Sequence, residues 1–169
     1  MKVLLNTSAL LLLVLGLCMS ACTPDEIPPI GEPFSQVKGI NGNWQLSSVV
    51  QVDELKTGSG NRLDVSGLTV GDQPAVINFN SSDFKFNVTP GSSKIYFPLS
   101  GTWAFDDNDF PSVINLTVNN EVFALQMFSP VREFVDNTMQ VKFIRPFCPG
   151  VSVPDKTGAV SYIYTFERQ

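Results

Sequence analysis

Residues 75–88 of this chain read Ala-Val-Ile-Asn-Phe-Asn-Ser-Ser-Asp-Phe-Lys-Phe-Asn-Val. Apolar residues alternate with other residues on either side of a polar turn over 80–83: first Ala75, Ile77 and Phe79, then Phe84, Phe86 and Val88. A period of two is typical of a strand that buries one face. The stretch therefore predicts a β-hairpin.

The same period continues in both directions from this hairpin. It covers residues 43–52, 95–99, 103–105, 113–118, 122–128, 139–144 and 160–168, and on the first segment Trp44, Leu46, Ser48, Val50 and Val52 share a face. Asn119 and Asn120 predict a tight turn, because asparagine tolerates positive φ. Only residues 64–68, inside a polar loop over 53–74, favour a helical turn. The pattern predicts an all-β fold, an antiparallel barrel of about eight or nine strands, with a β-sandwich as the alternative.

Two Gly-x-Trp sequences open strands, Gly42-Asn43-Trp44 and Gly101-Thr102-Trp103, and Arg168 lies near the end of the last strand. A first-strand Gly-x-Trp with such an arginine resembles the lipocalin superfamily. The resemblance implies that Trp44 closes the barrel floor and that Arg168 packs across its indole, a cation–π contact worth about 0.5–2 kcal/mol. More narrowly, residues 39–168 resemble uncharacterised lipocalin-like lipoproteins of Bacteroidetes-type bacteria. We therefore expect one lipocalin-like barrel over residues 39–169, with structural roles for Gly42 and Arg168.

The N-terminal residues predict export and lipidation. Lys2 precedes an apolar run over 9–19, which is shorter than the roughly 20 residues that span a bilayer and is typical of a secretory signal. Met19-Ser20-Ala21-Cys22 resembles a lipobox, whose cysteine receives acyl chains such as palmitate. We expect cleavage after residue 21 and a membrane anchor on Cys22. An ordinary secretory signal that ends near a cysteine is the alternative.

Residues 22–38 contain four prolines and no hydrophobic period, so they predict an extended tether. Asp25 and Glu26, just behind Cys22, resemble a surface-export signal of Bacteroidetes-type lipoproteins, with plain linker acidity as the alternative. We expect a cell-envelope protein that is anchored to the outer membrane, at either its periplasmic or its cell-surface face.

Composition argues against several kinds of chemistry. The chain has no histidine, which removes Ser-His-Asp and Cys-His nucleophiles and most zinc sites. Its net charge of −5 disfavours nucleic acid as a partner. Residues 106–109 (Asp-Asp-Asn-Asp) offer oxygen ligands for calcium, but their spacing favours a solvated turn. Neighbouring Asp53 and Glu54 point to opposite faces of a strand and make no glycosidase pair by themselves. We expect no metal, no cofactor and no enzyme activity.

The chain is rich in aromatic residues, with 13 phenylalanines, two tryptophans and three tyrosines. An eight-stranded barrel lined by them is either a solid core, the favoured interpretation, or a container for one small ligand. Trp44, Phe86, Trp103 and Phe105 are the candidate ligand-binding residues. The first hypothesis is a non-enzymatic protein that binds a small apolar ligand. The alternatives are an accessory subunit of an outer-membrane nutrient-uptake complex and, more weakly, a glycan-active enzyme that uses carboxylates.

Overall fold

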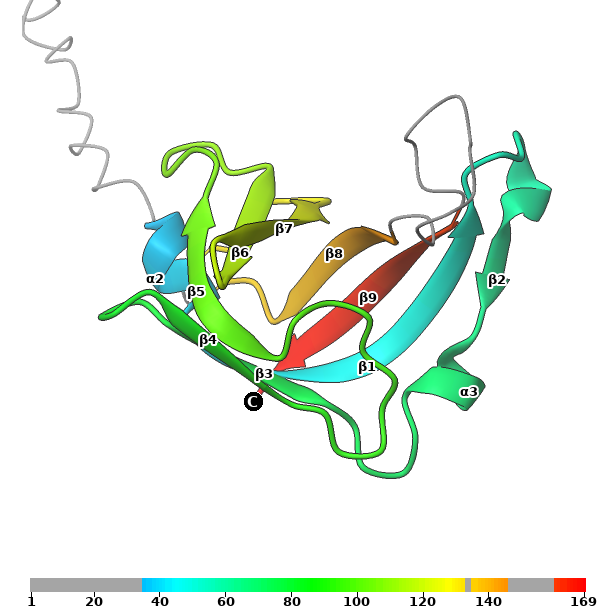
Figure 1. Cartoon of the computed structure of the whole chain (residues 1–169), viewed down its shortest axis with the longest axis horizontal. Coiled ribbons are helices and arrows are strands. Elements are labelled where there is room, and N and C mark those ends of the chain that lie inside the picture. Colours follow the sequence, from blue (N-terminus) through cyan, green and yellow to red (C-terminus); the bar gives the residue numbers. More distant parts are fainter. Residues whose placement is uncertain (1–34, 133–134, 146–159) are drawn as a thin grey trace, which may run out of the picture. The chain divides into compact units, whose positions relative to one another are not determined.

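A computed structural model describes residues 35–132, 135–145 and 160–169 (Figure 1). All described residues belong to one compact unit, Phe34–Gln169. The predicted signal peptide, Cys22 and most of the predicted tether lie outside the described residues. Within the described ranges, no helix is long and apolar enough to cross a membrane.

Strands make up most of the described chain. Its elements are α2 Gln36–Ile40, β1 Gly42–Asp53, the 3-10 turn η1 Ser59–Asn61, β2 Arg62–Asp64, α3 Ser66–Thr69, β3 Val76–Asn80, β4 Lys85–Thr89, β5 Ser100–Phe105, β6 Val113–Val118, β7 Glu121–Met127, β8 Thr138–Arg145 and β9 Val160–Arg168. Residues 36–38, which the sequence analysis placed in the tether, begin α2.

Eight of the strands close into an antiparallel barrel (Figure 1). From β3 onward each strand pairs with the next along the chain, and β1 pairs with β3 on one edge and with β9 on the other. β2 is an extra strand on the edge of β1, where Val50 lies opposite Asp64. The predicted antiparallel barrel is therefore confirmed, and its closure through the β1–β9 pairing decides against the β-sandwich.

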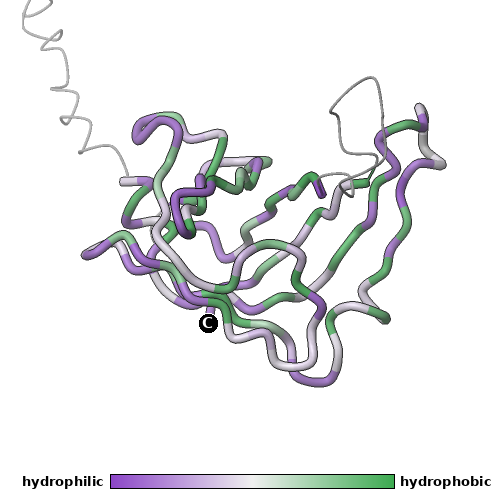
Figure 2. Tube along the Cα trace, in the orientation of Figure 1, coloured by the Kyte–Doolittle hydropathy of each residue, from purple (hydrophilic) through white to green (hydrophobic). Residues whose placement is uncertain are grey.

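The barrel interior holds the hydrophobic core. Hydrophobic and hydrophilic residues alternate along the strands, as a half-buried strand requires (Figure 2). The largest fully buried side chains come from strands all around the barrel and include Trp44, Phe79, Leu116, Leu125, Tyr164 and Phe166. Burying one such apolar side chain contributes about 1.5–3 kcal/mol, so this interior is the main source of stability.

The two predicted turns are present. The first lies one residue later than predicted, at 81–84 between β3 and β4, so Phe84, which was expected on the apolar face of the second strand, is in the turn and 44 % exposed. Asn119 and Asn120 join β6 to β7 with φ of 51° and 66°. Positive φ at both central residues of a two-residue turn matches the right-handed twist of a hairpin. The predicted helical turn also forms, as α3 at Ser66–Thr69.

Two further predictions about the strands are wrong. On β1, the pairing with β9 shifts register between Leu46 and Ser48, so that Val49 rather than Val50 takes the fully buried position. This bulge adds one residue, so Val49 takes the inner position, while Val52 farther along β1 is also buried (5 % exposed). Residues 95–99 are not a strand, because β4 pairs directly with β5 and leaves 90–99 as an irregular connection.

Candidate functional site

One end of the barrel is closed by α2. Trp44, near the start of β1, is fully buried, and its indole Nε1 donates a hydrogen bond to the Ile40 carbonyl at 2.7 Å. Arg168 lies opposite Trp44 on β9, with its guanidinium carbon 4.2 Å from the centroid of the indole ring. This is the contact that the lipocalin resemblance implies.

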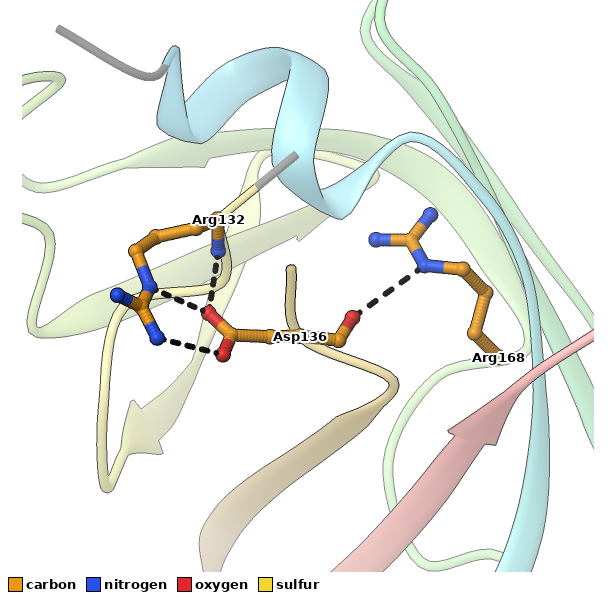
Figure 3. Close-up of polar contacts among 3 residues, drawn as sticks. All are labelled: Arg132, Asp136 and Arg168. Carbon is orange, nitrogen blue, oxygen red and sulfur yellow. Dashed lines mark hydrogen bonds and ion pairs between the residues drawn. The ribbon is translucent and has the colours of Figure 1, made fainter. Parts of the chain in front are cut away.

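Arg168 also ties α2 and the β7–β8 connection to the barrel. Its guanidinium donates to the carbonyls of Gly39, Asn41 (3.0 Å) and Asp136 (3.4 Å). Figure 3 shows that the Asp136 carboxylate in turn binds Arg132, at 3.1 Å from both Nε and Nη2. This pairing with Arg132 lowers the pKa of Asp136. Arg168 therefore holds the segments that close this end.

Gly42 begins β1 at the same end of the barrel. Its φ of +115° lies in a region that residues with a side chain rarely adopt. An added Cβ would come within 3.8 Å of the Arg168 guanidinium, which is ordinary contact, so the backbone conformation rather than space requires glycine here.

The four residues predicted to bind a ligand all lie in the barrel interior. Trp44 is 0 % exposed, Phe86 2 %, Trp103 2 % and Phe105 9 %. Trp103 packs edge-to-face on Phe105 and on Phe79, with ring centroids 5.3 and 5.6 Å apart, and its Nε1 donates to the Asn80 carbonyl. These side chains pack as core residues, and their contact with a ligand stays a prediction.

The opposite end of the barrel carries an aromatic group that the sequence analysis missed. The connection over 90–99 reaches across to β8 and β9, where Tyr96 stacks on Tyr162 at 4.4 Å between ring centroids. Phe97 packs edge-to-face on Tyr164 (5.2 Å) and on Phe143 (6.2 Å). We call these side chains the far-end cluster: Tyr96, Phe97, Phe143, Tyr162 and Tyr164.

Polar groups accompany the far-end cluster. The exposed Arg145 guanidinium lies 5.3 Å from the centroid of the Tyr96 ring, and the Tyr96 N–H donates to the Tyr164 hydroxyl at 3.3 Å. Burial raises the pKa of both Tyr162 and Tyr164, so both hydroxyls keep their protons at neutral pH. This end therefore combines aromatic surface, neutral hydroxyls and one cation.

A groove of about 820 Å³ lies on the outside of the barrel, along β3 to β6. We call it the outer groove. Ten of its lining residues are polar or charged, namely Asn78, Asn80, Asp83, Lys85, Asn87, Ser100, Thr102, Thr117, Asn119 and Asn120, and the other three are Phe86, Gly101 and Val118. In the sequence these residues are scattered over β3 to β6 and the turns beside them, so the pairing of the strands is what brings them together.

A family model covers most of this architecture. It matches residues 19–141, from the predicted lipobox into β8. The chain belongs to the family described as Domain of unknown function (DUF5004). That description agrees with the expectation of an uncharacterised family and names no activity. No curated protein and no solved structure matches the chain.

Two acidic residues of this DUF5004 member, Asp106 and Glu54, make structural contacts. The Asp106 carboxylate accepts hydrogen bonds from the Ser112 side chain and from the backbone N–H groups of Ser112 and Val113, which lowers its pKa. Glu54 pairs with Lys142 at 2.7 Å and also accepts from Ser161. Among the described residues, no group of three or more acidic, cysteine or histidine side chains is placed to hold a metal ion.

Proposed function

We propose that this protein is a lipid-anchored, non-enzymatic binding protein of the cell envelope, with a lipocalin-like barrel that takes a small apolar ligand. The lipocalin relationship is supported by the Gly-x-Trp of β1, by Arg168 on the Trp44 ring and by the short helix that closes the same end. At the opposite end of the barrel, the aromatic rings and tyrosine hydroxyls of the far-end cluster offer contacts to an apolar ligand.

The far-end cluster is the observation that carries the proposal. Tyr96 is partly exposed and stacks on a buried tyrosine, so an apolar ligand that enters here meets aromatic rings immediately. Trp44, Phe86, Trp103 and Phe105, which the sequence favoured as ligand contacts, form the packed interior of the barrel. We therefore place the ligand contacts at the far end rather than at Trp44.

Native mass spectrometry of a soluble Cys22→Ser form, purified gently, tests for a bound ligand. We expect a reproducible extra mass that denaturation removes. Titration with a hydrophobic fluorescent dye then locates the site. Tyr96→Ala is expected to weaken dye binding by about threefold to tenfold, since one aromatic contact contributes about 0.5–1.5 kcal/mol. Phe110→Ala, which removes an aromatic side chain that is 83 % exposed outside the far-end cluster, should change nothing. A clean apo mass together with no dye binding contradicts the proposal.

The anchor is tested separately. The wild-type protein is expected in the membrane fraction with acyl chains on Cys22, because two or three chains give stable attachment. Cys22→Ser should leave the protein in the soluble envelope fraction. Mass spectrometry of the N-terminal peptide distinguishes an acylated cysteine from an ordinary secretory cleavage.

The second candidate function is an accessory subunit of an outer-membrane nutrient-uptake complex. It is favoured by an apolar groove on the outside of β7 and β8, where the two strands pair only at Leu125–Met127. Val122 and Ile144 line this groove and are 59 % and 37 % exposed. If a partner binds there, Val122→Asp abolishes its cross-linking in native membranes, and Leu68→Asp, at a leucine exposed on α3, does not. No reproducible cross-linked partner would count against this candidate.

A further inference from the structure

The outer groove is built from two rows of polar side chains that run across the strands. In each row, consecutive residues are register partners on neighbouring strands, so their side chains point to the same outer face. The first row comprises Asn78, Asn87 and Ser100; the second comprises Asn80, Lys85, Thr102 and Thr117. Asn119 and Asn120, in the turn after β6, also line the groove.

The groove carries no net charge. Among the described residues, Lys85 and Asp83 are the only charged ones that line it, and their side chains form an ion pair at 3.2 Å. An anionic ligand would have to compete with Asp83 for Lys85, and a cationic ligand would have to compete with Lys85 for Asp83. The chemistry of the lining therefore favours a neutral, polar ligand.

The lining offers many hydrogen-bonding groups that are not already used. Asn78 donates to Asn43 and Asn80 accepts from the Ser82 N–H. Within the described residues, no hydrogen bond engages the side chains of the other three lining asparagines or of Thr102 and Thr117. Each amide offers donors and an acceptor, and each hydroxyl acts as both, which is what the hydroxyls of a sugar require.

We propose that the outer groove is a binding site for a neutral oligosaccharide. Its volume of about 820 Å³ lies within the range of about 300–1,000 Å³ that is usual for ligand sites. An extended peptide fits less well. Peptides commonly bind by adding a strand to a free sheet edge, whereas β3 to β6 each pair with neighbours on both sides.

Phe84 lies in the sequence between two residues that line the groove, Asp83 and Lys85. It is 44 % exposed, and one side packs on Trp103 at 5.4 Å between ring centroids. Its φ of 54° is unusual for a residue with a large side chain, and backbone strain of this kind is concentrated at functional sites. Phe84 is not among the residues that line the groove, and its ring packs on the interior Trp103, so the polar rows alone supply the proposed contacts.

The test uses the full mature lipoprotein in a zwitterionic detergent without a sugar headgroup. The probes are neutral hexasaccharides of α-1,4-glucan, β-1,3-glucan, β-1,4-glucan, xylan and mannan, with hexagalacturonate and a neutral Gly-Ser-Thr decapeptide as comparators. Saturation-transfer NMR detects binding and calorimetry measures Kd. We expect at least one neutral hexasaccharide to bind with a Kd below about 1 mM, a weak affinity for its size.

Matched variants locate the binding. Thr102→Ala and Asn87→Ala are expected to weaken it at least fivefold each. Thr89→Ala and Asn115→Ala are the controls, because they change the same residue types on the outer faces of β4 and β6 without touching the groove lining. The proposal is overturned if no neutral hexasaccharide binds, if hexagalacturonate or the peptide binds more tightly, or if the groove variants and the controls behave alike.

Discussion

Gly101 is a residue whose lack of a side chain lets two strands approach closely. An added Cβ would overlap the Thr117 carbonyl oxygen and would lie 2.8 Å from Val118 Cγ2 and 3.0 Å from Phe86 Cε1. The carbonyl belongs to β6 and is fixed by the sheet, so it has little freedom to yield. The glycine of the second Gly-x-Trp is therefore explained by the packing of β5 against β6.

Gly101→Ala is expected to lower the free energy of unfolding by about 1–3 kcal/mol, as overpacking of a core does. Urea denaturation measures the change. Gly67→Ala is the control, since nothing lies within 4 Å of its added Cβ and alanine is the better helix residue. It should leave stability unchanged or raise it by up to about 1 kcal/mol. Equal losses in the two variants would argue against the close approach.

Tyr164 makes the protein sensitive to alkali. Burial raises the pKa of its hydroxyl above the ordinary value of 10.0, which the unfolded chain retains. The unfolded state therefore loses this proton first as the pH rises. The contribution of Tyr164 to the free energy of unfolding should therefore be complete below pH 10 and decrease above it.

Tyr164→Phe should reduce this alkaline loss, at a cost at neutral pH of about 1 kcal/mol for the hydrogen bond from Tyr96. Urea midpoints at pH 7 to 11 measure both effects. The exposed side chain of Lys94 provides a control, and Lys94→Met should keep the wild-type pH profile. A Tyr164→Phe profile that falls as steeply as the wild type would show that other groups dominate.

At the level of elements, α2 depends on one side chain from the far end of the sequence. Arg168 donates to the carbonyls of Gly39 and Asn41, which belong to the end of α2 and the residue after it. A helix of five residues is too short to be stable alone, so its position must come from such contacts.

Arg168→Met keeps an unbranched apolar stem and removes the charge. We expect it to lower the free energy of unfolding by about 2–4 kcal/mol, because hydrogen bonds from a charged donor and the contact with Trp44 are lost together. Hydrogen exchange should also accelerate at the Gly39 amide, which bonds to the Ser35 carbonyl in α2. Arg62→Met, at an exposed arginine of β2, should do neither. Slow exchange at Gly39 in Arg168→Met would contradict the proposed anchoring of α2.

The elements that the sequence predicted well are those fixed by local pattern. The hairpin over 75–88 follows from alternation and a polar turn, both of which are local. The bulge after Leu46 could not be predicted, because it depends on the register against β9, more than 100 residues away. The 95–99 segment alternates like a strand, yet Phe97 is buried by the barrel end rather than by a sheet face.

For the molecule as a whole, the same distinction separates the closed end of the barrel from the outer groove and the far-end cluster. The closed end was accessible from the sequence, because Gly-x-Trp and a late arginine are a known combination. The outer groove and the far-end cluster both depend on which strands become neighbours. Tyr96, for instance, meets Tyr162 only because the connection after β4 reaches across the barrel to β9.

Acid should destabilise the whole barrel, through carboxylates spread over several of its connections. Four carboxyl groups have their pKa lowered by hydrogen bonds from neighbouring residues. The donors are Lys142 and Ser161 for Glu54, Ser66 for Asp64, Ser112 for Asp106, and Arg132 for Asp136. The unfolded chain retains ordinary values near 4 and therefore binds protons first as the pH falls. The stability that these groups contribute is thus present above about pH 4 and is lost as the pH drops through the folded-state values.

Urea midpoints from pH 7 to pH 2 should therefore be level at first and then fall below about pH 4. Asp106→Asn should have a lower urea midpoint than the wild type at pH 7, because an amide oxygen is a weaker acceptor than a carboxylate for the N–H groups of Ser112 and Val113. The difference should shrink at pH 2, because the wild-type carboxylate is then protonated in the unfolded state. Asp72→Asn, at an exposed aspartate of the loop before β3, should follow the wild type throughout. A constant difference between Asp106→Asn and the wild type at all pH values would mean that the Asp106 charge does not stabilise the turn between β5 and β6.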